Sequence, residues 1–261
     1  MTPIHDRGLA FDLATLTRRR ALTLLGGVGL ASLTACSTGG TAPTTAPTTA
    51  ADECRDVIPQ ETAGPYPGDG SNGPNVLTQS GIVRGDIRTS FGTGSRTAEG
   101  VPLRIELTVL DNGSGCAPYA GAAVYLWHCD IDGKYSLYSE GLTNENYLRG
   151  VQEADASGRL AFTSVFPAAY PGRWPHVHFE VYPSLAEATK AGTKITTSQL
   201  ALPEQVCKTV YGTPGYVQSV RTMARTSIED DTVFRDGHDE QLATVTGDVD
   251  AGYTAALTLA V

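Results

Sequence analysis

Residues 102–111 carry the pattern that most restricts how this chain can fold. In the run PLRIELTVLD, apolar residues from Leu103 to Val109 occupy every second position, and charged or hydroxylated residues lie between them. Successive side chains of a β-strand point to opposite faces, so this alternation predicts a strand with one face in a core.

Similar short runs recur along the chain, separated by turn-rich segments such as DNGSG and DASG. No internal repeat is present, and only residues 184–192 and 216–226 have a helical pattern. We therefore predict an all-β fold, a β-sandwich of mixed short strands with a few short helices in the connecting loops. The further predicted strands are 81–87, 122–129, 159–165, 176–182 and 254–261.

The first 36 residues read as an export signal rather than as part of the fold. Arg18 and Arg19 belong to a twin-arginine pattern, and the apolar run that follows is too short and too rich in glycine for a permanent membrane helix. The run ends in Leu-Thr-Ala-Cys36, which resembles a bacterial lipobox. We expect lipidation at Cys36, with the protein anchored on the outer face of the cell membrane or released extracellularly; the alternative is a buried helix ending in a free cysteine.

Residues 37–52 are nearly all Ser, Thr, Gly, Ala and Pro, a composition that cannot bury enough apolar surface to fold. We expect a flexible linker there and a single β-sandwich domain over residues 53–261. The formal net charge of the whole chain is −9, although the leader is basic. Such an acidic domain argues against nucleic acid and anionic lipid as partners, so membrane contact is expected only through Cys36.

Four cysteines follow Cys36, and their spacing does not match a CxxC metal site. An even number in an exported domain predicts disulfides, and four cysteines allow three pairings. We favour Cys54 with Cys129 and Cys116 with Cys207.

The segment GRWPHVHFEV places His176 and His178 two residues apart inside an apolar run. On a strand these side chains point to the same face, roughly 6.6 Å apart, so both imidazoles can approach one metal ion. Val177 and Phe179 face the opposite side. The histidine pair alone leaves zinc, copper and iron open.

Two tyrosines stand in related positions, each after a strand and a turn. Tyr135 follows the turn at Gly133 in YLWHCDIDGKYSLY, and Tyr170 follows a proline-rich turn in SVFPAAYPGRWPHVHF. A single tyrosine near a turn is usually a packing residue. Taken with the two histidines, however, these tyrosines complete a set of four potential ligands.

Together these segments resemble the intradiol ring-cleavage dioxygenases, the family of catechol 1,2-dioxygenase and protocatechuate 3,4-dioxygenase. The resemblance covers roughly residues 54–182 and includes PQETAGPY and NYLRGVQEADASGRLAF. The family's first tyrosine ligand follows a W-x-x-D-x-x-G-x-Y pattern, and its second closes a P-x-x-Y turn before the histidine pair. The matching residues are Trp127, Asp130, Gly133, Tyr135, Pro167, Tyr170, His176 and His178.

The resemblance implies a non-haem Fe(III) ion held by Tyr135 and His176 as equatorial ligands and by Tyr170 and His178 as axial ligands. Phenolate oxygens are hard donors that suit a trivalent ion, and an ion of high charge favours the ionised form of tyrosine. The implied activity inserts O₂ into a small aromatic diol and cleaves the ring between its two hydroxyl-bearing carbons, giving a cis,cis-muconate. Tyr170 would leave the metal and accept a substrate proton.

By the same resemblance, Arg173 lies near the ring and stabilises negative charge that develops on it. Gly64, Pro65 and Tyr66 match the segment that lines the family's substrate pocket. The alternatives are a surface arginine and a rigid Gly-Pro turn. At the level of the whole chain, the alternatives are a catalytically silent, lipid-anchored β-sandwich binding module and a copper or zinc protein that uses the His-x-His pair. The preferred catechol and the oligomeric state are left open.

Overall fold

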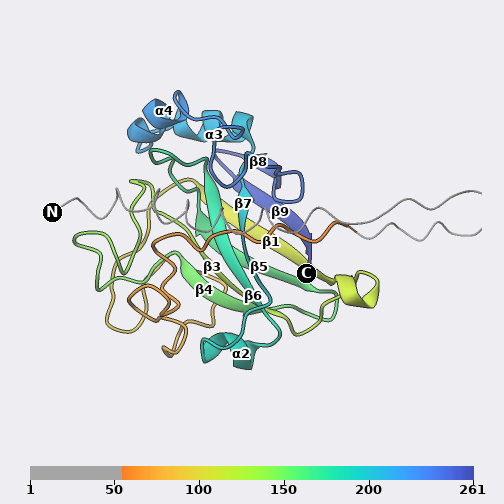
Figure 1. Cartoon of the computed structure of the whole chain (residues 1–261). Helices are drawn as coiled ribbons and strands as arrows, with labels where there is room; N and C mark the ends of the chain where they lie inside the picture. The colour runs from red at the N-terminus through yellow and green to blue at the C-terminus, as the bar shows by residue number, and fades with distance from the viewer. Residues whose placement is uncertain (1–54) are drawn as a thin grey trace, which may run out of the picture.

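The computed structural model describes residues 55–261, which form two β-sheets around a shared apolar core (Figure 1). Within these residues, the first sheet has five strands in the order β2-β1-β9-β8, with β5 also paired to β1. Their bounds are β1 Pro102–Asp111, β2 Ala117–Pro118, β5 Arg159–Val165, β8 Thr244–Asp248 and β9 Gly252–Ala260. The predicted all-β sandwich is confirmed.

The second sheet has four strands, all antiparallel, in the order β4-β3-β6-β7 among the described residues. Their bounds are β3 Ala123–Trp127, β4 Arg149–Glu153, β6 His176–Tyr182 and β7 Thr196–Ala201. The helices are short and lie at opposite ends of the sheets, α3 and α4 at one end and α2 at the other (Figure 1). They are η3 Asn112–Ser114, α2 Leu185–Thr189, α3 Glu204–Tyr211 and α4 Val217–Met223.

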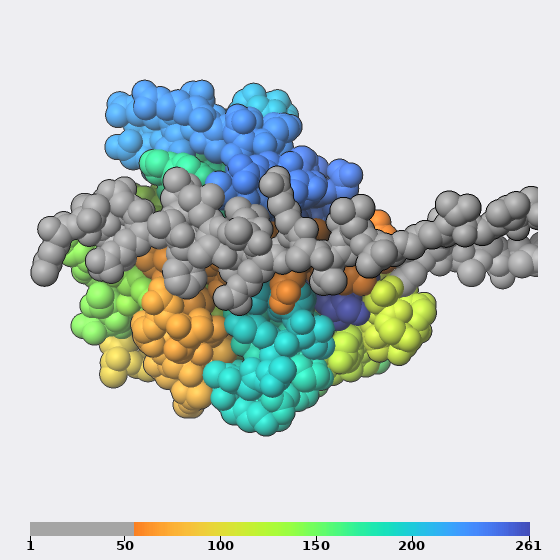
Figure 2. Space-filling model, viewed as in Figure 1, coloured from red at the N-terminus to blue at the C-terminus, as the bar shows by residue number. Residues whose placement is uncertain are grey.

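Strand β6 is buried along its whole length because both faces of its sheet are covered. Val177, Phe179 and Val181 enter the core shared with the first sheet. His176 and His178 point to the other face, where irregular segments cover the sheet. Figure 2 shows the early part of the described chain, in orange, forming the surface beside the segment around α2, in teal. This covered outer face is where the predicted ligands meet.

The predicted strand at 81–87 is wrong. Val83 forms an isolated bridge with Val151 of the second sheet, and Asp86 forms one with Thr163 of the first sheet. The segment therefore crosses from one sheet to the other, and no ladder can extend on either. The pattern also missed strands β4, β7 and β8 and helix α3, whereas the helices predicted around 184–192 and 216–226 correspond to α2 and α4.

Both predicted disulfides are wrong as well. Cys116 is disulfide-bonded, but Cys129 and Cys207 are free and buried. The thiol of Cys129 is directed to the carbonyl of Ala168, 3.6 Å away, and Cys207 packs into the core from α3, so neither is free to reach the predicted partner. Cys54, like Cys36, lies outside the described residues. Among residues 55–261, no helix is long and apolar enough to cross a membrane.

Candidate metal centre

The four predicted ligands converge on one point of the second sheet. Tyr135 Oη lies 3.3 Å from Tyr170 Oη, and Tyr170 Oη lies 3.1 Å from His176 Nε2. His176 Nε2 is in turn 3.0 Å from His178 Nε2. Separations of this size are what donors require when each binds the same ion at about 2 Å.

The two histidines are oriented by the sheet itself. Trp127 of β3 stands opposite His178 in the register, and its ring stacks on the imidazole with a centroid distance of 4.9 Å and an interplanar angle of 6°. His176 Nδ1 lies 2.5 Å from the carbonyl oxygen of Trp174. Donation of the Nδ1 proton to that carbonyl leaves Nε2 with a free lone pair that points to the other donors.

A turn held by Asp130 positions Tyr135 at the site. Asp130 Oδ1 accepts hydrogen bonds from the backbone N–H groups of Asp132, at 3.0 Å, and Lys134, at 2.9 Å. Gly133 has a positive φ of 76°, and a Cβ there would lie 3.2 Å from the Cβ of Tyr170. Glycine thus lets the two tyrosine-bearing turns approach each other, which explains the spacing of the motif.

Helices α3 and α4 fix the turn that carries Tyr170. The hydroxyl of Tyr211 donates to the carbonyl of Pro167 at 3.0 Å, and Tyr216 donates to the carbonyl of Phe166 at 2.8 Å. Ser219 Oγ accepts from the backbone N–H of Ala169 at 3.1 Å. The helix pair therefore holds Phe166, Pro167 and Ala169, three of the four residues immediately before the predicted ligand.

Burial sets the protonation of all four donors. It raises the pKa of Tyr135 and of Tyr170 above the usual tyrosine value. It lowers the pKa of His176 to about 3 and that of His178 well below its usual value. At neutral pH the protein alone therefore presents two neutral phenols and two neutral imidazoles.

This donor set fits a hard, highly charged cation. Within residues 55–261, no group of three or more His, Cys, Asp or Glu side chains is placed to hold a metal. The described part also contains no hydrogen-bond partner for the buried Nδ1 of His178. Two phenols that ionise only next to strong positive charge, with two imidazoles, match Fe(III) better than a soft ion.

Arg173 is buried beside the ligands and is not a surface arginine. Its Nε donates to Asp231 Oδ2 at 3.0 Å, and one Nη donates to Gln199 Oε1 at 2.6 Å. Gln199 stands opposite His178 in the β6–β7 register. Asp231 also accepts from the backbone N–H of Trp174 at 2.6 Å. A fixed positive charge thus lies next to the donor set.

Sequence reasoning missed Gln199 and Asp231. Gln199 lies within TTSQLA, where a strand pattern is weak, although a glutamine inside a buried strand is a usable signal once β7 is known. Asp231 follows Glu229 and Asp230 in a run that looks solvated, yet its side chain is fully buried. Only tertiary structure separates it from its exposed neighbours.

The predicted Gly64-Pro65-Tyr66 segment lies against the ligands. Gly64 has a φ of 67°, and a Cβ there would lie 3.3 Å from His178 Cε1. The ring of Tyr66 is 4.9 Å from the ring of Tyr135. All predicted site residues therefore meet at one place, except Cys36, which lies outside the described residues.

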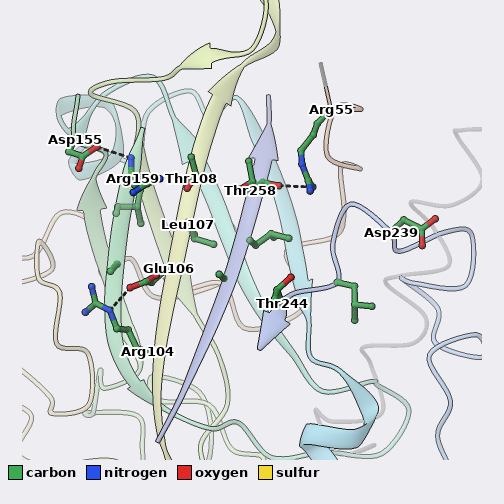
Figure 3. Close-up of a pocket in the computed structure, with 15 residues that line it drawn as sticks. Arg55, Arg104, Glu106, Leu107, Thr108, Asp155, Arg159, Asp239, Thr244 and Thr258 are labelled. Atoms are coloured by element: carbon green, nitrogen blue, oxygen red, sulfur yellow. Dashed lines mark hydrogen bonds and ion pairs between the residues drawn. The ribbon is translucent and has the colours of Figure 1, made fainter. Parts of the chain in front are cut away.

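A hollow of about 790 Å³ opens on the outer face of the five-stranded sheet (Figure 3). None of the four ligands lines it. Among its charged residues, Arg104 pairs with Glu106 at 2.7 Å and Arg55 donates to the carbonyl of Thr258 at 3.3 Å. This face is therefore separate from the metal centre.

Comparison with known proteins finds similarity to dioxygenases. A family model described as a dioxygenase matches residues 72–197. Chlorocatechol 1,2-dioxygenase from Pseudomonas sp. (strain P51) is 32% identical over 145 residues, which are 48% of this chain and 53% of that relative. The chain therefore spans about half the length of this curated relative.

Two solved structures share the fold. The intradiol ring-cleavage dioxygenase from Tetranychus urticae superposes with a TM-score of 0.61 at 23% identity, covering 79% of this chain and 94% of that one. The dioxygenase domain of a carbohydrate-binding fusion protein from Streptomyces sp. SirexAA-E gives 0.50 at 21% identity, covering 79% and 98%. The segment matched by the family model contains all four converging ligands. This segment is therefore similar to a dioxygenase, and residues 55–261 share the fold of an intradiol ring-cleavage dioxygenase.

Proposed function

We propose that this protein is a non-haem Fe(III) intradiol dioxygenase. It inserts both atoms of O₂ into a catechol-type ring and cleaves the bond between the two hydroxyl-bearing carbons, giving a cis,cis-muconate. The observation that carries the proposal is the convergence of two phenol oxygens and two imidazole nitrogens, in which each donor atom lies 3.0–3.3 Å from at least one other. Tyr135, Tyr170, His176 and His178 would hold the iron.

When bound, Fe(III) would take both oxygens of the catechol and make its ring reactive toward O₂. The two tyrosines would then play different parts. Tyr135 is 2% exposed and held by a hydrogen-bonded turn, so it stays in place. Tyr170 is partly exposed, and its neighbour Gly172 would meet nothing within 4 Å of an added Cβ. In the proposed reaction Tyr170 Oη would swing outward and carry a proton from a substrate hydroxyl.

Arg173 would stabilise negative charge on the ring. Its guanidinium is held between Asp231 and Gln199, so it need not reorganise when that charge develops. Gly64, Pro65 and Tyr66 would form one wall of the substrate site. Gly64 leaves room beside His178 that any side chain would fill, and Tyr66 offers an aromatic face beside Tyr135.

The test combines the colour of the iron-loaded protein with analysis of its product. Loaded protein is expected to be wine-red from tyrosinate-to-iron charge transfer, and Tyr135→Phe is expected to bleach it. With catechol and ¹⁸O₂, the product should have the mass of catechol plus two labelled oxygen atoms. Tyr253→Phe is a matched control, because Tyr253 is a buried tyrosine of the shared core and is not a ligand.

Two outcomes would reject the proposal. Colourless protein with a full complement of zinc or copper would identify a different metal protein built on the His-x-His pair. Red protein that binds catechols but consumes no O₂ would identify a catalytically silent binding module. Oxygen uptake across catechol, protocatechuate, hydroxyquinol and caffeate-like compounds would then identify the preferred diol.

We also propose export by the twin-arginine route and lipid anchoring at Cys36, on the strength of the leader sequence. Cell fractionation with labelled fatty acid tests both points. Arg18→Lys together with Arg19→Lys should keep the protein in the cytoplasm, and Cys36→Ser should abolish labelling. Normal export of the double variant, or unchanged labelling of Cys36→Ser, would contradict this localisation.

A further inference from the structure

Arg149, the first residue of β4, is a buried cation whose role the chemistry above does not explain. Arg149 is 1% exposed, and each N–H of its guanidinium donates a hydrogen bond to an oxygen atom. Nε donates to Ser136 Oγ at 3.1 Å. One Nη donates to the carbonyl of Pro67 at 2.8 Å and to the Tyr125 hydroxyl at 3.0 Å. The other donates to the carbonyls of Tyr66 and Ser136, each at 3.0 Å.

Apart from the Tyr125 hydroxyl on β3, these acceptors belong to two segments that lie beside the predicted ligands. The first is residues 64–68, here called the strap, which covers His178 through Gly64 and Tyr135 through the Tyr66 ring. The second is the turn that carries Tyr135, whose next residue is Ser136. A single side chain thus joins the wall of the proposed substrate site to a metal ligand.

The contact between Arg149 and the strap is close. Gly68 has a φ of 71°, and a Cβ at that position would lie 2.8 Å from an Nη of Arg149. Among residues 55–261, Arg149 forms no ion pair with a carboxylate, so its partners are all neutral oxygens. A planar fork with five donors satisfies this arrangement, whereas an ammonium group has three donors on one atom.

We propose that Arg149 is a positioning residue that locks the strap to the Tyr135 turn, so that the two walls of the site keep a fixed separation. This separation determines how large a ring fits between Tyr66 and the ligands. Any effect of this contact on catalysis depends on the proposed function. The lock itself, however, is a property of the metal-free protein and can be measured there.

Hydrogen–deuterium exchange of the metal-free protein tests the lock directly. In Arg149→Lys, one ammonium group cannot reach both segments, so amides of residues 62–72 should exchange at least about tenfold faster, from the loss of charged hydrogen bonds. Arg84→Lys is the matched control. Arg84 donates to the carbonyls of Arg149, at 2.7 Å, and Asn146, at 3.0 Å, but to no strap residue. It should leave exchange in the strap unchanged.

Gly68→Ala provides a second variant in which Arg149 is intact. Its new Cβ collides with the guanidinium and should accelerate exchange in the same peptide, whether or not Arg149→Lys folds. Unchanged strap exchange in Gly68→Ala or in folded Arg149→Lys would overturn the proposal. Equal acceleration in every peptide of the domain would also overturn it, because that result indicates a general loss of stability.

Kinetics of the iron-loaded protein separate this proposal from the proposed function. If wild type opens catechol, Arg149→Lys should raise KM about tenfold with a smaller change in kcat, and should reduce discrimination against bulky ring substituents. An unchanged KM and unchanged discrimination would reject the role in the site. If wild type is colourless and inactive, the proposed function fails while the exchange result still decides whether the lock exists.

Discussion

Replacing Asp231 by asparagine removes the negative charge that balances buried Arg173. The side chains are 0% and 9% exposed, respectively, and their charged atoms lie 3.0 Å apart. Loss of one partner of a buried ion pair typically destabilises a protein by about 3–5 kcal/mol. Gln199 still accepts a hydrogen bond from Arg173 at 2.6 Å, so we expect the lower end, about 3 kcal/mol. For a domain of this size, that corresponds to a fall in Tm of about 6–12 °C.

The assay is thermal unfolding of the metal-free protein, with Asp86→Asn as the control. Asp86 also pairs with an arginine, Arg88, at 2.7 Å, but the two side chains are 53% and 42% exposed. Such a surface pair contributes less than about 1 kcal/mol, so the control should unfold almost like wild type. Equal effects of the two substitutions, or a change below about 1 kcal/mol for Asp231→Asn, would refute the argument.

The pH dependence provides a second check on Asp231. Burial alone would raise the pKa of Asp231, but Arg173 and the N–H of Trp174 outweigh it and hold this pKa below its usual value. A carboxyl whose folded pKa is lowered contributes stability above its unfolded pKa and loses it as the pH falls through the folded pKa. The difference between wild type and Asp231→Asn should therefore stay constant from about pH 8 to pH 5. A difference that fades within this range would contradict an ionised Asp231.

Two further predictions concern the ligands. Gly133→Ala should destabilise the protein by about 1–2 kcal/mol, because alanine is strained at a φ of 76°. It should also weaken the charge-transfer band of the iron-loaded form, because the new Cβ would crowd Tyr170. An unchanged band would contradict the close approach of the two turns. Burial lowers the pKa of His128 to about 4, that of His176 to about 3 and that of His178 well below its usual value. Below about pH 6.5 the three histidines bind protons in the unfolded chain but stay neutral in the folded protein. The unfolding free energy of the metal-free protein should therefore fall as the pH is lowered, with a slope that approaches about 4 kcal/mol per pH unit for the three histidines together. Denaturant unfolding between pH 7 and pH 5 measures this slope, and a flat profile would show that the histidines are accessible to protons.

Three of the four predicted ligands, Tyr135, His176 and His178, are positioned by short-range structure, which a local sequence pattern can indicate. His176 and His178 share a face through the two-residue period of one strand. Tyr135 follows an aspartate turn whose hydrogen bonds span only four residues, from Asp130 to Lys134. Where a side chain is oriented by its own strand or turn, a local pattern contains the necessary information.

The residues that support the ligands are different, because partners distant in sequence decide their positions. Asp231 meets Arg173 across 58 positions, and Arg149 meets the carbonyl of Tyr66 across 83. Residues 81–87 have a strand-like composition, but two different sheets compete for the segment. The cysteine pairing failed for the same reason, since spacing along the chain does not show which layer buries each thiol.

Tyr135 and Tyr170 would both offer a phenol oxygen to the metal, but their surroundings differ. Tyr135 is enclosed by the Tyr66 ring, and the Arg149 lock holds the backbone beside it. Tyr170 follows Ala169, whose N–H donates to Ser219, and its own carbonyl accepts from the N–H of Arg173 at 3.3 Å. Its side chain is partly exposed beside the open turn at Gly172. In the proposed enzyme, the ligands would have to hold iron and also make way for a diol that binds through two oxygens. A buried Tyr135 that stays in place and a partly exposed Tyr170 that leaves would divide these two tasks.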